Sequence, residues 1–143
     1  KAMIASGIRV QNYGTVIVTL ADEDKKEALP FIRRFYNMGF NIEATSSTAE
    51  TLKHHGIRTK VLRKPSEGSR EILDAISAGY VSYVINTRAI LSGIHYEDGA
   101  VIRSAASQNH VTMFTSLDTV RVLLDVLEEI TIGVSAITEE ENI

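Results

Sequence analysis

The chain has 143 residues, a formal net charge of −3 and no cysteine, which excludes a disulfide framework, thiol chemistry and a cysteine-based zinc site. Three glutamates near the end, Glu139 to Glu141, account for the whole net charge, so the body is neutral and lacks the electrostatic footprint of a nucleic-acid-binding protein. No apolar run reaches membrane-spanning length, and the first residues do not resemble a signal peptide. We therefore expect a soluble, cytoplasmic domain of ordinary size without nucleic-acid or membrane partners.

The first residues resemble the end of a helix. The segment Lys1–Ser6 has a helical pattern that is closed by Gly7, a residue typical of the position just after a helix. We expect residues 1–12 to be the end of a preceding helix and a linker, 13–131 to be the domain, and 132–143 to be a loosely ordered tail. On this interpretation the chain is a segment of a longer polypeptide.

Strand and helix patterns then alternate along the chain. Runs of β-branched and apolar residues predict buried strands at 15–21, 40–44, 58–62, 80–85 and 111–114. Apolar residues at helical spacing predict helices near 24–38, 48–55, 70–78, 98–109 and 120–130. Pro30 lies inside the first helical pattern and should kink that helix or mark a late start, and residues 89–97 are expected to be irregular. The alternation favours an α/β fold of three layers, with a parallel sheet of five strands covered by helices on both faces.

The most informative stretch lies where the second predicted strand meets its helix. There the hydroxyl-rich run Thr45-Ser46-Ser47-Thr48 directly precedes the helical pattern. The first N–H groups of a helix lack intrahelical partners and carry partial positive charge, so neighbouring hydroxyl groups suit the binding of phosphate. A simpler alternative is that these hydroxyl groups only cap the helix, because Ser and Thr are common caps. Both interpretations remain open.

Parallel strands end at a common edge of the sheet, and ligands of α/β proteins bind beyond that edge. The residues expected there are Thr19 to Lys25, Thr45 to Thr48, Lys64 to Gly68, Asn86 to Arg88 and Thr115 to Asp118. Hydroxyl, lysine and amide groups dominate this set. We therefore expect a phosphorylated ligand.

The same set offers little for catalysis. Its carboxylates are Asp22, Asp24, Glu67 and Asp118, and each is better explained as a helix-start residue or a loop charge. The histidines lack metal-ligand spacing, and neither a Walker motif nor Gly-x-Gly-x-x-Gly occurs. We expect neither a metal site nor tight binding of nucleoside triphosphates or dinucleotides.

Short motifs distributed along the chain resemble those of a known family. They are Lys1-Ala-x-x-Ala-Ser-Gly7, Asp22-x-Asp-Lys25, Gly39-Phe40, Ala44-Thr-x-x-Thr-Ala49, Lys64-x-x-Glu-Gly68, Val84-Ile-Asn-Thr87, Ile102-Arg103 and Thr115-Ser-Leu-Asp-Thr119. Together they resemble the C-terminal regulatory domain of the carbamoyl phosphate synthetase large subunit, which has the methylglyoxal-synthase-like fold. The resemblance implies a five-stranded parallel sheet in the order 3-2-1-4-5 and a domain that performs no chemistry itself.

By this resemblance, the domain would bind a phosphorylated effector such as UMP. It would regulate the synthesis of carbamoyl phosphate from glutamine, bicarbonate and ATP, for pyrimidine or arginine biosynthesis. The domain would hold no cofactor, whereas the parent enzyme would use ATP with Mg²⁺ or Mn²⁺. The implied partners are the remainder of the large subunit, the glutaminase small subunit and further copies of the same chain.

The resemblance also implies an effector site. Its residues would be Thr19, Lys25, Thr45, Ser46, Ser47, Thr48, Lys64, Asn86, Thr87 and Arg88. Lys25 and Lys64 would hold the phosphate together with the two threonines of the 45–48 loop. Asn86 and Thr87 would face the ribose or base, and Thr19 would lie at the pocket floor.

Two of these positions depart from the pattern of many relatives. Ser47 stands where Gly is common, and Arg88 stands where some relatives have a second Thr. A side chain at Ser47 narrows the approach to phosphate or adds a hydroxyl donor. Arg88 is able to clamp a phosphate through two parallel hydrogen bonds, which a Thr cannot do.

Two other functions stay open. Methylglyoxal synthases resemble this chain at the phosphate loop, but they carry Gly-Gly-Asp after the third strand and a further Asp after the fourth. Those places here read Glu67-Gly68-Ser69 and Asn86-Thr87, so a lyase acting on dihydroxyacetone phosphate would need Glu67 or Asp22 as its base. The remaining alternative is an assembly module in which the anion pocket is vestigial.

Overall fold

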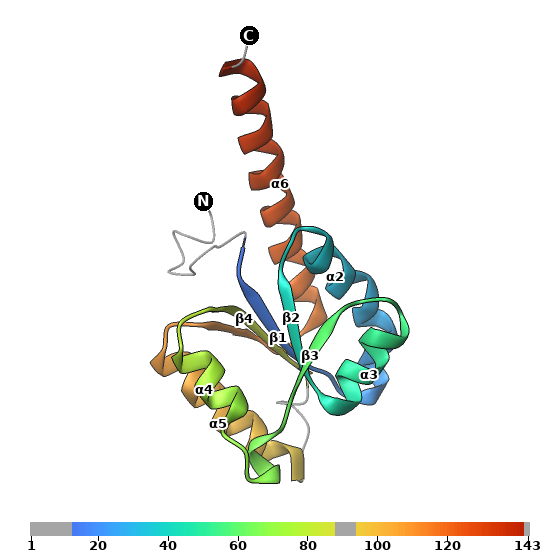
Figure 1. Cartoon of the computed structure of the whole chain (residues 1–143), viewed down its shortest axis with the longest axis vertical. Coiled ribbons are helices and arrows are strands. Elements are labelled where there is room, and N and C mark those ends of the chain that lie inside the picture. Colours follow the sequence, from blue (N-terminus) through green and yellow to red (C-terminus); the bar gives the residue numbers. More distant parts are fainter. Residues whose placement is uncertain (1–12, 88–93, 142–143) are drawn as a thin grey trace.

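A single parallel sheet of five strands forms the centre of the molecule (Figure 1). The computed structural model describes residues 13–87 and 94–141, with side chains for 13–87 and 98–130. The strands are β1 (Thr15–Thr19), β2 (Asn41–Thr45), β3 (Thr59–Leu62), β4 (Val81–Asn86) and β5 (Thr112–Phe114). Neighbouring strands all pair in parallel, in the order β3-β2-β1-β4-β5. The predicted sheet and strand order are confirmed.

Helices cover both faces of the sheet (Figure 1). One face packs against α2 (Lys25–Asn37), α3 (Ser46–His54) and α6 (Leu117–Glu141), and the other against α4 (Glu71–Ser77) and α5 (Ile94–Gln108). Two short 3-10 turns, η1 (Asp22–Asp24) and η2 (Pro65–Glu67), follow β1 and β3. These are the three layers that the alternation of strands and helices predicts.

The central strand β1 is buried on both of its faces. Val16 and Val18 pack into the core under α2, α3 and α6, whereas Ile17 packs into the core under α4 and α5. All three side chains are fully buried. This explains why a nearly continuous β-branched run, rather than an alternating one, marks this strand in the sequence.

Pro30 does not delay the start of α2. The helix begins at Lys25 and contains Pro30 in its interior, preceded by η1. The late start that Pro30 suggested is therefore wrong. Buried Ala28, Ile32 and Phe35 hold this helix on the sheet, and their packing outweighs the backbone hydrogen bond that proline cannot make.

The helix α5 begins four residues earlier than predicted, at Ile94 instead of Asp98. Gly99 lies inside this helix, where glycine costs about 1 kcal/mol relative to alanine. Burial of Ile102 and Ala106 further along α5 offsets that cost. Of the irregular stretch expected at 89–97, residues 94–97 are therefore helical, and 88–93 lie outside the described residues.

The helix α6 continues to Glu141, beyond the predicted end near residue 130. Residues 132–141 continue this helix, although Gly133, Val134 and Thr138 are weak helix formers. None of the described helices combines the length and the apolar character that crossing a bilayer requires. The helix end expected at residues 1–12 lies outside the described residues.

Candidate ligand pocket

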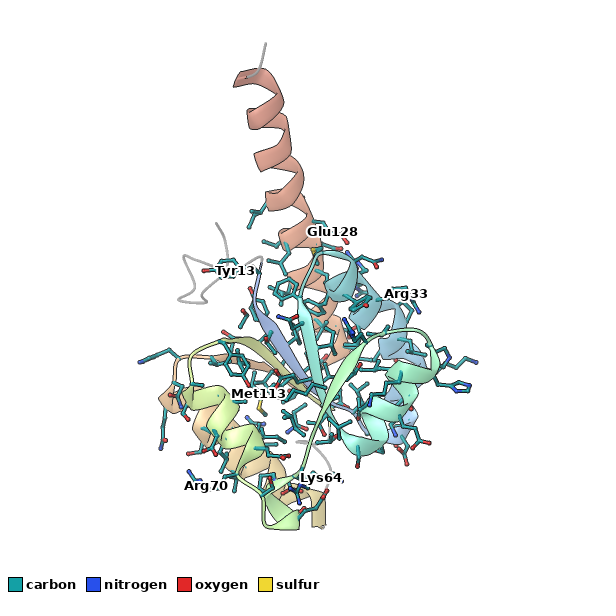
Figure 2. All side chains as sticks on the ribbon, in the orientation of Figure 1. Tyr13, Arg33, Lys64, Arg70, Met113 and Glu128 are labelled. Atoms are coloured by element: carbon teal, nitrogen blue, oxygen red, sulfur yellow. The ribbon has the colours of Figure 1, made fainter. Side chains whose placement is uncertain are left out.

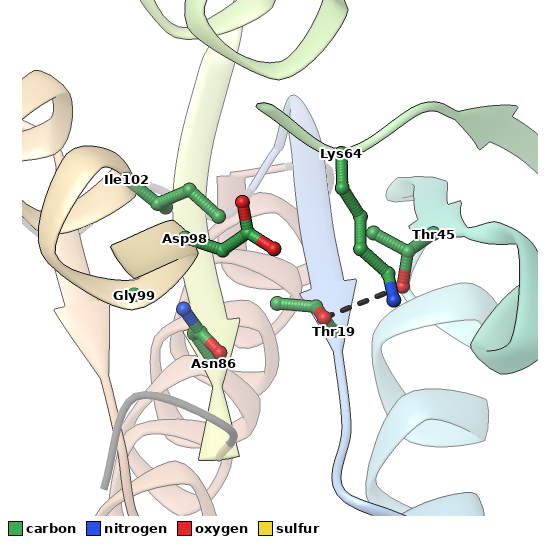
Figure 3. A pocket seen from close by; sticks show the side chains of 7 residues that line it. All are labelled: Thr19, Thr45, Lys64, Asn86, Asp98, Gly99 and Ile102. Carbon is green, nitrogen blue, oxygen red and sulfur yellow. Dashed lines mark hydrogen bonds between the residues drawn. The ribbon is translucent and has the colours of Figure 1, made fainter. Parts of the chain in front are cut away.

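Four of the predicted site residues line one pocket at the carboxyl edge of the sheet (Figure 3). Thr19, Thr45 and Asn86 are the last residues of β1, β2 and β4. Thr19 lies in register with Asn86 across the β1–β4 pair, and β2 lies on the other side of β1. Lys64 joins them from the loop after β3 (Figures 2 and 3). The strand order thus brings residues from four separate parts of the chain together.

One end of the pocket offers hydrogen-bond donors. Thr45 donates its hydroxyl hydrogen to Thr19 Oγ1 at 3.3 Å, which leaves the hydroxyl hydrogen of Thr19 for another acceptor. Figure 3 shows the Lys64 side chain extending toward these two threonines. Hydroxyl hydrogens beside an ammonium group suit an anionic ligand group.

The other end of the pocket offers acceptors. Asp98, near the start of α5, is only 9% exposed. Its two carboxylate oxygens accept hydrogen bonds from the N–H and the hydroxyl of Ser66 in η2, both at 2.8 Å. Asn86 Oδ1 is buried and has no hydrogen-bond partner in the part of the chain that the structure describes. A buried acceptor without a donor is costly, so this end favours ligand groups that donate hydrogens.

The threonines around the start of α3 do not act as helix caps. Thr45 occupies the N-cap position of α3, but its side chain makes no capping hydrogen bond and instead bonds Thr19. Thr48 is fully buried, and its Oγ1 accepts the N–H of Leu20 at 3.1 Å. The capping interpretation is therefore wrong for both threonines, which join the end of β1 to β2 and α3.

The sequence between these elements matches a known domain. Residues 27–115 match the family model described as the MGS-like domain. The chain belongs to the MGS-like domain family. A solved methylglyoxal synthase from Elizabethkingia anophelis NUHP1 superposes with a TM-score of 0.61, over 80% of this chain and 79% of that chain, at 15% identity. At that identity the likeness shows the fold alone.

Ser46 and Ser47 form the first turn of α3 in this MGS-like domain but do not line the pocket. The helix begins at Ser46, two residues earlier than predicted. Ser46 is exposed, whereas Ser47 is half-buried. The Oγ of Ser47 is buried, with no hydrogen-bond partner among the described residues, and its hydroxyl is the one in this turn that remains to be satisfied by a ligand or water.

Thr87 has a structural contact rather than a place in the pocket. Its Oγ1 accepts the N–H of Ala21 at 2.8 Å, and the residue is almost fully buried. It ties the segment after β1 to the segment after β4. Thr87 instead lines a separate cavity of about 250 Å³. The other residues that line this cavity are Asp24, Glu27, Thr115, Ser116, Leu117 and Asp118. The predicted contact of Thr87 with a ribose or base stays a prediction.

Lys25 is not among the residues that line the pocket of the MGS-like domain. Its Nζ pairs with Asp22 Oδ1 at 2.7 Å within the turn before α2. A phosphate bound by Lys25 would have to compete with this carboxylate. Arg88 lies outside the described residues, so its role as a phosphate clamp stays a prediction.

Asp98 is the pocket residue that sequence reasoning missed. Asp98 does not follow a strand but belongs to a helix, α5, that lies at the same edge of the sheet. A usable indication was present, because the predicted helix after β4 begins at Asp98 and helices after parallel strands begin at this edge. Gly99 and Ile102 of α5 complete the lining.

The pocket is narrow and of mixed charge. Among the described residues, its lining contains one cation, Lys64, and one carboxylate, Asp98. The cavity measures about 10 Å³, which is about the space that a single water molecule needs. A larger ligand would therefore extend beyond this cavity unless the walls of the pocket separate.

Proposed function

We propose that this MGS-like domain is the non-catalytic allosteric domain of a carbamoyl phosphate synthetase large subunit, and that it binds a phosphorylated effector such as UMP. The observation that carries the proposal is the pair of donors at one end of the pocket, namely the Lys64 ammonium group and the hydroxyl of Thr19, which already accepts the hydroxyl hydrogen of Thr45. The short motifs along the chain support the choice of this branch of the family.

The effector's phosphate would lie between Lys64 and the first turn of α3. The ammonium group of Lys64 supplies charge, and the first N–H groups of α3 add the positive end of a helix dipole. The ribose or base would then extend toward Asn86, whose Oδ1 is buried without a partner among the described residues.

Effector binding would act on the parent enzyme by favouring one of its two states. A coupling of 1–3 kcal/mol is typical of such regulation. The regulated reaction would form carbamoyl phosphate from glutamine, bicarbonate and ATP with Mg²⁺ or Mn²⁺, in the cytoplasm, for pyrimidine or arginine synthesis. The domain would contact the remainder of the large subunit, with the glutaminase small subunit and further copies of the large subunit in the same assembly.

Calorimetric titration of the 143-residue chain with UMP tests this function. We expect saturable binding that Lys64→Met weakens by about 10-fold to 100-fold, since a hydrogen bond to a charged group contributes about 1.5–3 kcal/mol. Lys53→Met, an exposed lysine on α3, is the matched control and should leave the affinity unchanged. No saturable binding of UMP, IMP or phosphoribosyl pyrophosphate would refute the function.

A second candidate is a lyase that eliminates phosphate from dihydroxyacetone phosphate. Asp98 favours it, because a carboxylate in the same pocket as Lys64 is placed to remove a proton. The bases considered from the sequence, Glu67 and Asp22, are not among the residues that line this pocket. A solved protein with the same fold is a methylglyoxal synthase.

A colorimetric assay for methylglyoxal separates the two candidates. We expect no product, because both oxygens of Asp98 already accept hydrogens from Ser66. Methylglyoxal formation that disappears in Asp98→Asn would establish the lyase and refute the non-catalytic function.

A further inference from the structure

Asp98 and Ser66 join two segments of the chain across the pocket. Asp98 belongs to α5, and Ser66 belongs to η2, 32 positions earlier in the sequence. Ser66 supplies both its backbone N–H and its hydroxyl, each at 2.8 Å from a different carboxylate oxygen. Two hydrogen bonds to one charged group make a directional contact that is stronger than a neutral pair.

This contact lies beside the narrow pocket, because Asp98 and Lys64 both line the pocket and Lys64 precedes Ser66 by two positions. With Ser66 bound to Asp98, the cavity of about 10 Å³ holds about one water molecule. Lys64 is the residue that precedes η2 and forms its N-cap. Separation of η2 from α5 therefore opens the pocket and moves Lys64 in the same step.

Opening leaves Asp98 in need of other hydrogen donors. Asp98 is only 9% exposed. A buried carboxylate that lacks hydrogen-bond donors is strongly unfavourable. Ligand hydroxyl or N–H groups are able to replace those of Ser66. The buried Asn86 Oδ1, which lacks a partner within the described part of the chain, lines the same pocket and favours the same kind of group.

The charge of Asp98 also disfavours some ligands. An anionic group placed beside this carboxylate would meet a like charge in a partly buried site, and such juxtapositions are costly. Lys64 is the single cation among the described residues that line the pocket, and it lies with the threonines at the donor end (Figure 3). The described part of the lining is therefore suited to one anionic group, at that end.

We propose that Ser66 is an internal competitor of the ligand, and that Asp98 selects ligands that combine one phosphate with nearby hydroxyl groups over ligands with a second anionic group. The proposal rests on the proposed binding of a phosphorylated effector and adds to it a specificity-determining residue and a built-in closure. Ligand hydroxyl groups take the place of Ser66 at Asp98, and the pocket opens as they do so.

The closure is tested by calorimetric titration of Ser66→Ala with UMP. This variant keeps the N–H contact but removes the hydroxyl contact, so the pocket opens more easily. We expect UMP to bind about threefold to tenfold more tightly than to the unmodified chain, which is the usual range for one hydrogen bond. Ser104→Ala, an exposed serine on α5, should not change the affinity. An affinity that is unchanged or weaker in Ser66→Ala would overturn the closure.

The selectivity is tested with two probes, UMP and uridine 3′,5′-bisphosphate, which carries its second phosphate on the sugar. The unmodified chain should prefer UMP by about tenfold or more, and in Asp98→Asn the preference should fall below about threefold. Asp74→Asn, a surface carboxylate on α4, should retain the full preference. The preference is the ratio of two affinities measured on the same protein. A variant that is partly unfolded would bind both probes less, so partial unfolding would not change this ratio.

The outcomes separate this proposal from the one on which it rests. Saturable binding of UMP that depends on Lys64, with the same preference in Asp98→Asn as in the unmodified chain, would overturn only the role of Asp98. An absence of binding by UMP and by inorganic phosphate would overturn the effector function and the selectivity together.

Discussion

Thr48 Oγ1 accepts the backbone N–H of Leu20 at a distance of 3.1 Å. The motif Ala44-Thr-x-x-Thr-Ala49 assigns this hydroxyl to a phosphate, yet in the structure it holds the end of β1 against α3. The residue is fully buried. Loss of ligand binding in a Thr48 variant would therefore not distinguish a ligand contact from a disturbed pocket wall, and Lys64 is the better residue for testing the site.

Thr48→Val should lower the free energy of unfolding by about 1–3 kcal/mol. Valine has nearly the shape of threonine but cannot accept the hydrogen bond from Leu20 N–H, so a buried hydrogen bond is lost. Urea unfolding followed by circular dichroism measures the change. Thr48→Ser keeps an acceptor and should lose clearly less stability than Thr48→Val. A loss in Thr48→Ser alone, with Thr48→Val as stable as the unmodified chain, would show that the methyl group, not the hydroxyl, matters.

Phe35→Ala should destabilise the fold by about 3–5 kcal/mol. Phe35 is fully buried and contacts Phe40 edge to face, with ring centroids 5.4 Å apart, while Tyr83 lies on another side at 6.3 Å. Removal of the ring would leave a cavity between α2 and the sheet. Val122→Ala, at a site that is 53% exposed on α6, should change stability by less than about 0.5 kcal/mol. A loss below about 1 kcal/mol in Phe35→Ala would contradict this packing.

Glu43 makes stability fall as pH rises. Burial raises the pKa of Glu43 above its ordinary value of 4.5, against the opposing effects of the Lys60 charge and the Tyr80 hydroxyl hydrogen bond. The folded state thus holds this proton more tightly than the unfolded chain does. Stability is therefore highest below pH 4.5 with respect to this group, and declines as pH rises through the raised pKa.

Glu43→Gln removes that dependence and should be more stable than the unmodified chain at pH 7 but not at pH 4. Thermal unfolding at the two pH values measures the difference. The exposed Glu50 on α3 provides the control, since Glu50→Gln should give the same small difference at both pH values. A Glu43→Gln chain that is less stable at pH 7 would show that the Lys60 and Tyr80 contacts outweigh burial.

Arg34 joins α2 to α6 through two carboxylates. Its Nε donates to Glu128 Oε1 at 2.8 Å, and its Nη2 donates to Asp125 Oδ1 at 2.9 Å. The hydrogen bond from Arg34 lowers the pKa of Glu128, so this part of the stability is present above the ordinary glutamate pKa and is lost as pH falls through the lowered pKa.

Arg34→Lys should cost only about 0.5–1 kcal/mol, because Asp125 is largely exposed and Glu128 is only half-buried. Lysine cannot reproduce the planar fork that reaches both partners. The loss should shrink at high salt and again at low pH, when Glu128 is protonated. Arg121→Lys, on the exposed side of α6, should have no comparable effect; an Arg34→Lys loss that persists in 1 M salt would point to packing of the side-chain stem instead.

The alternation of strand and helix patterns was enough to predict the three layers and three residues of the pocket lining. Thr19, Thr45 and Asn86 come together because parallel strands end at one edge, and each residue can be placed there from its own strand. The order of the strands could not be predicted from these patterns, because hydrophobic periodicity does not show which strands are neighbours in the sheet. It was predicted correctly only through the resemblance to the family.

The tertiary structure decided which polar groups remain available to a ligand. Thr48, Thr87 and Asp98 are each engaged by a partner 28, 66 and 32 positions away in the sequence, and no local pattern contains that information. A motif shows that a hydroxyl or carboxylate lies near the edge of the sheet, but a hydrogen bond depends on distances of a few tenths of an ångström between segments brought together by folding. The sequence therefore shows which residue types lie near the edge of the sheet. Their hydrogen-bond partners are defined only when β1, η2 and α5 pack together in the folded structure.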